Sequence, residues 1–367
     1  MEKRRVAMTL EQLWHRVPGG TAVAALGMAR HLKDLPGIEL VGVAARHPKQ
    51  PPAEWASPVE VFELPLPRAA LYRTWHKWRR PRVQLATGPV DVIHATSAAT
   101  PPKSAPLVMT VHDLAWQHDE SHFTPRGLTF FRRGLEVALR DVDLVLCPSR
   151  ATALDCEKAG WSPDRIRVIP LGTDATLARD ATIASTRARY SLERDYVLWT
   201  GTIEPRKNLA RLLEAYRSLD ADVDLVLCGP RGWNEDLDAL IAPVKERVRI
   251  LGFVPRDDLA ALYAGARAFC WPSLREGFGF PVLEAMAQGT PVVTSRGTST
   301  EEIAGEAAVL VDPHDPADIA SGIERILGDD ALHARLSEAG SARAREFTWE
   351  RTARAVADAY EEVSQRT

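Results

Sequence analysis

The sequence predicts an α/β protein with two parallel sheets, each covered by helices on both of its faces. Thirteen short apolar stretches, four to six residues long, alternate along the chain with amphipathic stretches, which is the pattern of repeated βαβ units. Thirteen strands are too many for one ordinary doubly wound sheet. A length of 367 residues also exceeds what one hydrophobic core usually serves. Two Rossmann-like domains therefore fit the sequence best.

The predicted strands form two series, one in each half of the chain. In chain order they are Val6–Leu10, Leu40–Ala44, Val59–Leu64, Val92–Ala95, Leu107–Val111, Leu144–Cys147, Ile166–Ile169, and then Tyr196–Thr200, Asp224–Cys228, Val248–Leu251, Ala268–Trp271, Pro291–Thr294 and Ala307–Val311. Residues 173–195 separate the two series and lack a sustained apolar face, so we place the domain boundary within them. We expect a first domain over residues 1–175 and a second over 176–346. A final helix, capped by Thr348, completes the chain over 347–367.

Composition and charge restrict the class of protein. The net charge of −3 gives no reason to expect a nucleic-acid partner. Residues 1–180 carry +5 and the remainder −8. The basic first half suits an anionic acceptor or a membrane surface, or it is an accidental imbalance of surface charge. The four cysteines form no CxxC pair, which indicates neither a zinc site nor a disulfide framework. We expect no metal site, no signal peptide, no spanning helix, and a cytoplasmic location.

The strongest functional signal is the segment EGFGFPVLE, residues 276–284. It follows a predicted strand and opens a helix. Gly277 and Gly279 let the backbone approach a ligand closely, and the amides at the helix start favour an anion such as a diphosphate. Glu276 and Glu284 can both face the crevice at the carboxyl ends of the strands, where a carboxylate suits sugar hydroxyls. The alternative is an ordinary glycine-rich turn with Glu284 on a solvated helix face.

A second signal is the segment GTIEPRKN, residues 201–208, between a predicted strand and a predicted helix. Arg206 and Lys207 place two cations at a strand-to-helix corner, where phosphates bind. The alternative is a solvated basic helix start, which the helix dipole disfavours.

Weaker signals lie in the first half. Gly19-Gly20 stands between the first strand and the first helix, where it would admit a diphosphate, although many loops contain this pair. His112, at the end of a strand, suits a hydroxyl partner or an acid/base group, or a structural histidine bonded to backbone. Arg68–Arg82 has aromatic residues on one helical face among basic ones. It predicts an ordinary surface helix, a peripheral contact with the inner face of a membrane, or a site for an anionic acceptor.

Together these segments resemble a known family. The E-x7-E spacing of Glu276 and Glu284 and the G-T-x-x-x-R-K-N segment at 201–208 are similar to the donor-site motifs of retaining family-four glycosyltransferases. His112 and the Gly19-Gly20 loop occupy the order expected of that family. The resemblance implies the GT-B fold, in which two Rossmann-like domains face each other across a central cleft. It also implies that the last helix, over 347–367, crosses back to the N-terminal domain. It is closest to bacterial mannosyl- or rhamnosyltransferases of polysaccharide or glycolipid assembly.

The resemblance also implies residue roles. Glu276 would bond hydroxyls of the donor sugar, and Glu284 would hold the ribose. Arg206 and Lys207 would stabilise the diphosphate as it leaves. Backbone amides would come from Gly277, Phe278 and Gly279. Gly20 would approach the diphosphate from the first domain, His112 would line the junction of sugar and acceptor, and Val254 would lie near the nucleobase.

The function predicted is retaining transfer of a hexose from a nucleotide-diphosphate sugar to a glycan or lipid-linked acceptor, without a metal or other cofactor. GDP-mannose is the first donor to test. Two D-x-D sequences, at 141–143 and 222–224, precede strands and therefore lie at the opposite sheet edge from the crevice. A nucleotide-sugar epimerase of the same fold and a non-catalytic sugar-nucleotide-binding protein are alternatives. A Rossmann dehydrogenase is disfavoured because residues 11–21 contain no G-x-G-x-x-G.

Overall fold

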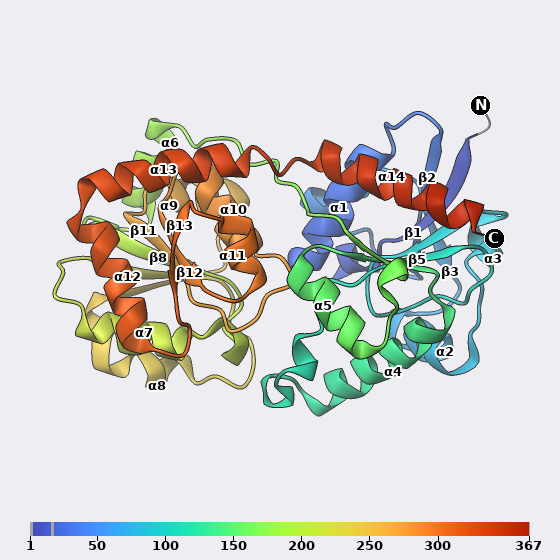
Figure 1. The fold of residues 1–367 in the computed structure, drawn as a ribbon, viewed down its shortest axis with the longest axis horizontal. Coiled ribbons are helices and arrows are strands. Elements are labelled where there is room, and N and C mark those ends of the chain that lie inside the picture. The colour runs from blue at the N-terminus through green and yellow to red at the C-terminus, as the bar shows by residue number, and fades with distance from the viewer. Residues whose placement is uncertain (1–2, 16–17, 367) are drawn as a thin grey trace. The chain divides into compact units, whose positions relative to one another are not determined.

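The computed structural model describes residues 3–15 and 18–366 (Figure 1). The chain forms two compact units, one comprising Met1–Gly172 with Phe347–Thr367 and the other Thr173–Glu346. Each unit holds one parallel sheet with helices on its faces. The predicted fold class, a pair of Rossmann-like α/β domains, is therefore confirmed.

The first unit contains a seven-stranded sheet in the order β3-β2-β1-β4-β5-β6-β7. Its pairings are all parallel, so the carboxyl ends of its strands share one edge. The strands are β1 (Arg4–Thr9), β2 (Ile38–Ala45), β3 (Val61–Leu64), β4 (Val92–Ala95), β5 (Leu107–Thr110), β6 (Leu144–Cys147) and β7 (Ile166–Val168). The central strands β4, β5 and β6 are buried at every position, as strands covered on both faces must be.

The helices of this unit begin and end at residues that suit helix termini. Thr124 and Ser149 cap the helices α4 and α5 through their hydroxyl oxygens, and Gly160 ends α5 in the left-handed region. The helices are α1 (Gly20–Leu32), α2 (Arg68–Trp78), α3 (Gln84–Thr87), α4 (Pro125–Asp141), α5 (Arg150–Ala159) and α14 (Trp349–Gln365).

Helix α14 returns to the first unit and packs along α1 (Figure 1). Gly27 allows this close approach, because a Cβ at that position would lie 2.4 Å from the indole of Trp349. A buried polar contact fixes the other end of the helix. His94, on β4, is fully buried and bonds the Tyr360 hydroxyl through Nδ1 at 2.7 Å and the Thr110 hydroxyl through Nε2 at 2.8 Å.

The second unit contains a six-stranded parallel sheet in the order β10-β9-β8-β11-β12-β13. The strands are β8 (Tyr196–Thr200), β9 (Asp224–Cys228), β10 (Val248–Gly252), β11 (Ala268–Trp271), β12 (Val292–Ser295) and β13 (Ala308–Val311). The helices are α6 (Asp180–Arg189), α7 (Leu209–Ser218), α8 (Leu237–Ile241), α9 (Arg256–Ala264), α10 (Phe280–Ala287), α11 (Ser299–Ala304), α12 (Pro316–Gly328) and α13 (Asp330–Ala344).

The predicted strands match the observed ones to within about two residues at each end. Residues 173–195 lack a sustained apolar face, yet they include regular structure. They contain α6, which the apolar pattern does not reveal because polar contacts hold it. Arg189 bonds both carboxylate oxygens of Asp258 at 2.7 Å. Arg187 donates to the carbonyl of Gly265 at 3.1 Å. A helix attached in this way lacks the apolar stripe on which sequence prediction depends.

Candidate active site

The corner between β8 and α7 carries Arg206 and Lys207. A short 3-10 turn, Pro205–Lys207, ends at Asn208, which adopts the left-handed conformation with φ of 60°. The buried Asn208 amide donates to the carbonyls of Pro272 and Pro313 at 2.8 and 2.7 Å. These two hydrogen bonds connect the segment that carries Arg206 and Lys207 to the loops that follow β11 and β13.

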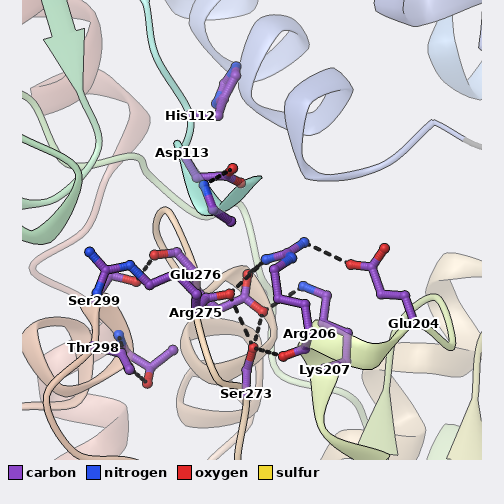
Figure 2. Close-up of polar contacts among 12 residues, drawn as sticks. His112, Asp113, Glu204, Arg206, Lys207, Ser273, Arg275, Glu276, Thr298 and Ser299 are labelled. Carbon is purple, nitrogen blue, oxygen red and sulfur yellow. Dashed lines mark hydrogen bonds and ion pairs between the residues drawn. The ribbon is translucent and has the colours of Figure 1, made fainter. Parts of the chain in front are cut away.

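Glu276, in the loop after β11, receives both cations (Figure 2). Lys207 Nζ lies 2.5 Å from Oε1, and Arg206 Nη1 lies 3.1 Å from Oε2. The Ser273 hydroxyl also donates to Oε1 at 2.7 Å. Arg206 extends a second nitrogen, Nη2, to Glu204 Oε1 at 2.8 Å. Two carboxylates and two cations thus compensate one another in a largely buried cluster.

The cluster fixes the charge of Glu276. Burial alone would raise the pKa of this carboxyl, but Lys207, Arg206 and the hydrogen bond from Ser273 outweigh burial and lower it to about 2. The group is ionised at every pH near neutrality. Lys207 Nζ also lies 5.0 Å from the centre of the Trp271 ring, on the strand that leads into this loop. The acidic and basic groups are therefore held in defined positions before any ligand arrives.

The loop from residue 277 to 279 turns the chain from Glu276 into α10. Gly279 has φ of 116°, and its Cβ would lie 2.9 Å from the Thr300 side chain, so glycine suits this position on both grounds. It is the N-cap of α10 and supplies no side-chain cap. Pro281 in the first turn has no amide hydrogen, and the amides of Val282 and Leu283 donate to the Gly279 carbonyl at 3.0 and 3.2 Å. Phe278 is buried against Phe280.

Glu284 has different surroundings from Glu276. It lies on α10 and accepts a hydrogen bond from the Tyr263 hydroxyl at 3.2 Å; that hydroxyl also contacts Thr200 Oγ1 at 2.8 Å. Burial raises the pKa of Glu284 to about 7, with Arg256 and the Tyr263 hydrogen bond only partly opposing it. The second carboxyl of the motif therefore changes charge near neutral pH, whereas the first does not.

In the first unit, Gly19 is the N-cap of α1 and its carbonyl accepts the amide of Ala22 at 2.9 Å. A Cβ on Gly19 would meet nothing within 4 Å. Gly19 and Gly20 are both exposed, so the start of a 13-residue helix is open to an anionic ligand.

His112 follows β5, and its Nε2 lies 3.1 Å from the carbonyl oxygen of Thr96. A carbonyl accepts only, so Nε2 carries the hydrogen. Burial lowers the pKa of this imidazole, although Thr96 and Asp113 oppose the shift. The neutral ring therefore presents Nδ1 as an acceptor. Gln12 Nε2 donates to the same Thr96 carbonyl at 2.7 Å and so helps to fix its position.

The structure brings together Glu276, Arg206 and Lys207, with the 277–279 loop following directly. Val254, which the resemblance places near the nucleobase, is a buried side chain at 7% exposure, whereas its neighbour Phe253 is 71% exposed. Sequence reasoning missed the supporting polar groups Glu204, Ser273 and Ser299, the last of which donates to the Glu276 carbonyl at 2.7 Å. Glu204 stands within the GTIEPRKN segment, which is the one signal that could have indicated it.

The D-x-D aspartates are engaged elsewhere. Asp141 pairs with Arg79 at 2.6 Å, and Asp143 binds Lys103 at 2.5 Å. Asp222 pairs with Arg194 at 2.8 Å, and Asp224 with Arg249 at 3.1 Å. Within residues 3–15 and 18–366, no group of three or more His, Cys, Asp and Glu side chains is arranged to hold a metal ion.

The two Rossmann-like units, each with one parallel sheet, match the fold of GT-B glycosyltransferases. HepE from Anabaena, solved with UDP and glucose, matches the fold with a TM-score of 0.77 at 20% identity, over 98% of this chain and 100% of that one. WaaG, a glycosyltransferase involved in lipopolysaccharide biosynthesis, matches with a TM-score of 0.72 at 16% identity, over 97% and 99%.

Residues 18–177 match the model of Glycosyltransferase Family 4, and residues 185–343 match that of Glycosyl transferases group 1. O-antigen chain mannosyltransferase B of Escherichia coli is 32% identical over 280 residues, which are 73% of this chain and 74% of that protein. The D-inositol 3-phosphate glycosyltransferase of Salinispora tropica is 34% identical over 293 residues; the match covers 70% of this chain and 59% of that protein. The chain belongs to the family-four glycosyltransferases, and it is an enzyme of the transferase class.

Proposed function

We propose that the protein transfers a hexose from a nucleotide-diphosphate sugar to a glycan or glycolipid acceptor, with retention and without a metal. One observation carries the proposal: Arg206 and Lys207 converge on the buried Glu276, directly before the loop of residues 277–279. This cluster supplies cations for a diphosphate and a carboxylate for sugar hydroxyls.

The negative charge of Glu276 supports one role for this carboxylate and another for the departing diphosphate. A carboxyl with a pKa of about 2 is a weak base and a weak nucleophile. It is suited to accept hydrogen bonds from the donor sugar and poorly suited to remove the acceptor's proton. The departing diphosphate, which gains negative charge as the glycosyl bond breaks, is the better base on the same face. Transfer on that face retains the anomeric configuration.

Arg206 and Lys207 would stabilise the charge that grows on the leaving diphosphate. Both are fixed in place by Glu276, and Arg206 also by Glu204, so they need little reorganisation when that charge develops. The N-terminus of α10 adds its dipole. In this proposal these groups act where a divalent cation acts in other transferases, so EDTA should leave the rate unchanged. A large loss that Mg²⁺ restores would refute the metal-free mechanism.

The donor is proposed to be GDP-mannose. The name of the E. coli mannosyltransferase supports the sugar, whereas the UDP in HepE makes UDP-glucose the comparison to include. A thermal-shift screen of GDP-mannose, GDP, UDP-glucose and UDP tests the base, because a ligand at about 100 times its Kd adds about 2.7 kcal/mol of stability.

Transfer then decides the function. The bound donor is incubated with mannose-terminated glycans, and the anomeric proton of the product is read by NMR. Retention with wild-type protein, and strong loss in Glu276→Gln, is the expected result. An inverted product would overturn the mechanism. Ring isomerisation without any acceptor would show an epimerase, and tight nucleotide binding without any turnover would show a binding protein.

A peripheral membrane contact through Arg68–Arg82 is proposed for a lipid-linked acceptor. Leu71 and Trp75 of α2 enter the core, as the surface-helix interpretation requires, but Trp78 is 58% exposed and Leu85, just beyond, 65%. The segment also carries exposed basic residues, and Lys77 Nζ lies 5.4 Å from the centre of the Trp78 ring. Among the described residues no helix is long and apolar enough to cross a membrane. Flotation with anionic vesicles, lost in Trp78→Ser, tests this contact.

A further inference from the structure

A hydrogen-bonded series of three side chains links the end of β8 to helix α10 in the second unit. Thr200 is the last residue of β8, and its Oγ1 lies 2.8 Å from the hydroxyl of Tyr263 on α9. That hydroxyl donates to Glu284 Oε2 at 3.2 Å. Because a hydroxyl has one hydrogen and an ionised carboxylate only accepts, Thr200 donates to Tyr263 and Tyr263 donates to Glu284.

The position of the Tyr263 hydroxyl does not depend on this series alone. The side chain is 2% exposed, and its ring packs edge-on against Phe269 of β11, with 5.2 Å between centroids and 72° between planes. The Tyr263 carbonyl accepts the Thr290 hydroxyl at 2.6 Å. The ring and the backbone of Tyr263 are thus held independently of Glu284, so the hydroxyl fixes where Oε2 lies.

Among the residues that the structure describes, only one oxygen of Glu284 accepts a side-chain hydrogen bond. The other oxygen, Oε1, is left to a ligand or to solvent. Burial raises the pKa of this carboxyl, and Arg256 and the Tyr263 hydrogen bond oppose the rise, so Tyr263 favours the ionised form. An ionised carboxylate is the stronger acceptor of hydrogen bonds. Tyr263 therefore acts on both the orientation and the charge of Glu284.

The place of Glu284 in the chain restricts which part of a donor it meets. Glu276, with its two cations, precedes the 277–279 loop. Glu284 lies one helical turn beyond that loop, on α10. In a nucleotide-diphosphate sugar, the diphosphate separates the hydroxyls of the transferred sugar from those of the ribose. With the diphosphate on the two cations and the sugar at Glu276, the second carboxylate is left for the hydroxyls on the nucleoside side.

We propose that Tyr263 is a positioning residue of the donor site. Held by Thr200, its hydroxyl fixes Glu284 Oε2, so that Oε1 accepts hydrogen bonds from the hydroxyls of the donor's ribose. The proposal rests on the proposed function, since it requires a nucleotide donor. The ribose lies away from the reacting carbon, so this interaction contributes equally to ground-state and transition-state binding. Its loss should raise the KM for the donor and leave kcat nearly unchanged.

The test compares nucleotides with and without ribose hydroxyls on the full chain. GDP and 2′,3′-dideoxy-GDP, or the same pair for whichever base the donor screen selects, are titrated by calorimetry. A hydrogen bond to a charged group changes affinity by roughly 10- to 100-fold, so the wild type should prefer GDP by about that factor. Tyr263→Phe, which removes only the hydroxyl, should reduce this preference at least about 5-fold.

Tyr216→Phe is the matched control. Tyr216 is equally buried in the same unit, but its hydroxyl donates to the carbonyls of Val223 and Arg247, at 2.6 and 3.0 Å. This variant should lose stability and keep the wild-type preference for GDP. Rates measured with the donor should show the rise in KM without a fall in kcat in Tyr263→Phe, which a general loss of stability would not produce.

The outcomes separate this inference from the proposed function. An unchanged preference in Tyr263→Phe, or a kcat that falls as far as kcat/KM, overturns the inference. So does a loss of preference for GDP over IDP, which lacks the guanine amino group, because Glu284 would then face the base. If GDP binds and transfer occurs but dideoxy-GDP binds the wild type equally well, the inference fails while the proposed function stands. If no nucleotide diphosphate binds, the proposed function itself fails.

Discussion

Replacing Lys207 with methionine, which keeps an unbranched side chain and removes the charged amino group, tests the electrostatic account of the site. Glu276 is 8% exposed and its pKa falls from 4.5 to about 2, which corresponds to about 3 kcal/mol of stabilisation at neutral pH. Lys207 is the largest favourable contributor. Because Arg206 and Ser273 remain, we expect Lys207→Met to lose about 2 kcal/mol of that stabilisation.

The matched variants form a double-mutant cycle. Glu276→Gln alone leaves Lys207 and Arg206 without their shared carboxylate and should also destabilise the protein. The double variant Lys207→Met/Glu276→Gln leaves no uncompensated charge, since Arg206 still pairs with Glu204 at 2.8 Å. Its stability should return to within about 1 kcal/mol of wild type, which gives a coupling energy of about 2 kcal/mol in urea unfolding.

Turnover should behave differently from stability. Each variant in the cycle should lose roughly 10²- to 10³-fold in kcat, as expected when a preorganised charge is removed from a transition state. Near-normal turnover by Lys207→Met would remove this lysine from catalysis. A double variant no more stable than the singles would refute the charge-compensation reasoning, whatever its activity.

Three further predictions address other parts of the molecule. Glu284 has a raised folded pKa, so wild-type stability should decline as pH rises from about 4.5 through 7; Glu284→Gln should abolish that slope in urea unfolding followed against pH. Gly27→Ala should destabilise the first unit by about 1–3 kcal/mol through its clash with Trp349, whereas Gly328→Ala, where a Cβ meets nothing within 4 Å, should not. At pH 7 the ¹⁵N spectrum of His112 should show a neutral ring protonated at Nε2; protonation at Nδ1 instead would contradict the bond to Thr96.

The strands could be predicted because their signal is local. Tyr196–Thr200 and Ala268–Trp271 are buried along their whole length, so their apolar runs begin and end where the strands do. The helix Asp180–Arg189 could not be predicted in the same way, because an ion pair to Asp258 and a hydrogen bond to the Gly265 carbonyl replace the apolar stripe.

In the candidate site, too, residues with a local sequence signal could be predicted and residues that depend on contacts between distant segments could not. Arg206, Lys207 and Glu276 each belong to a contiguous motif at a strand end, so the sequence identifies them and their edge of the sheet. Ser273 and Ser299 carry no such signal, because their roles depend on which loops become neighbours when β11 lies beside β12. The charge states of the two glutamates could not be predicted from the sequence either, because Glu276 and Glu284 are the same residue type. Burial acts on both carboxyls, but Lys207 and Arg206 lower the pKa of Glu276, whereas burial raises the pKa of Glu284.

The return of α14 to the first unit has a consequence for biosynthesis. Residues 347–367 leave the ribosome after the whole of the second unit, yet they supply Trp349 beside Gly27 and Tyr360 beside His94. A nascent chain that ends before them exposes a fully buried imidazole and the apolar face of α1. The first unit therefore completes its native fold only after the second unit has been translated.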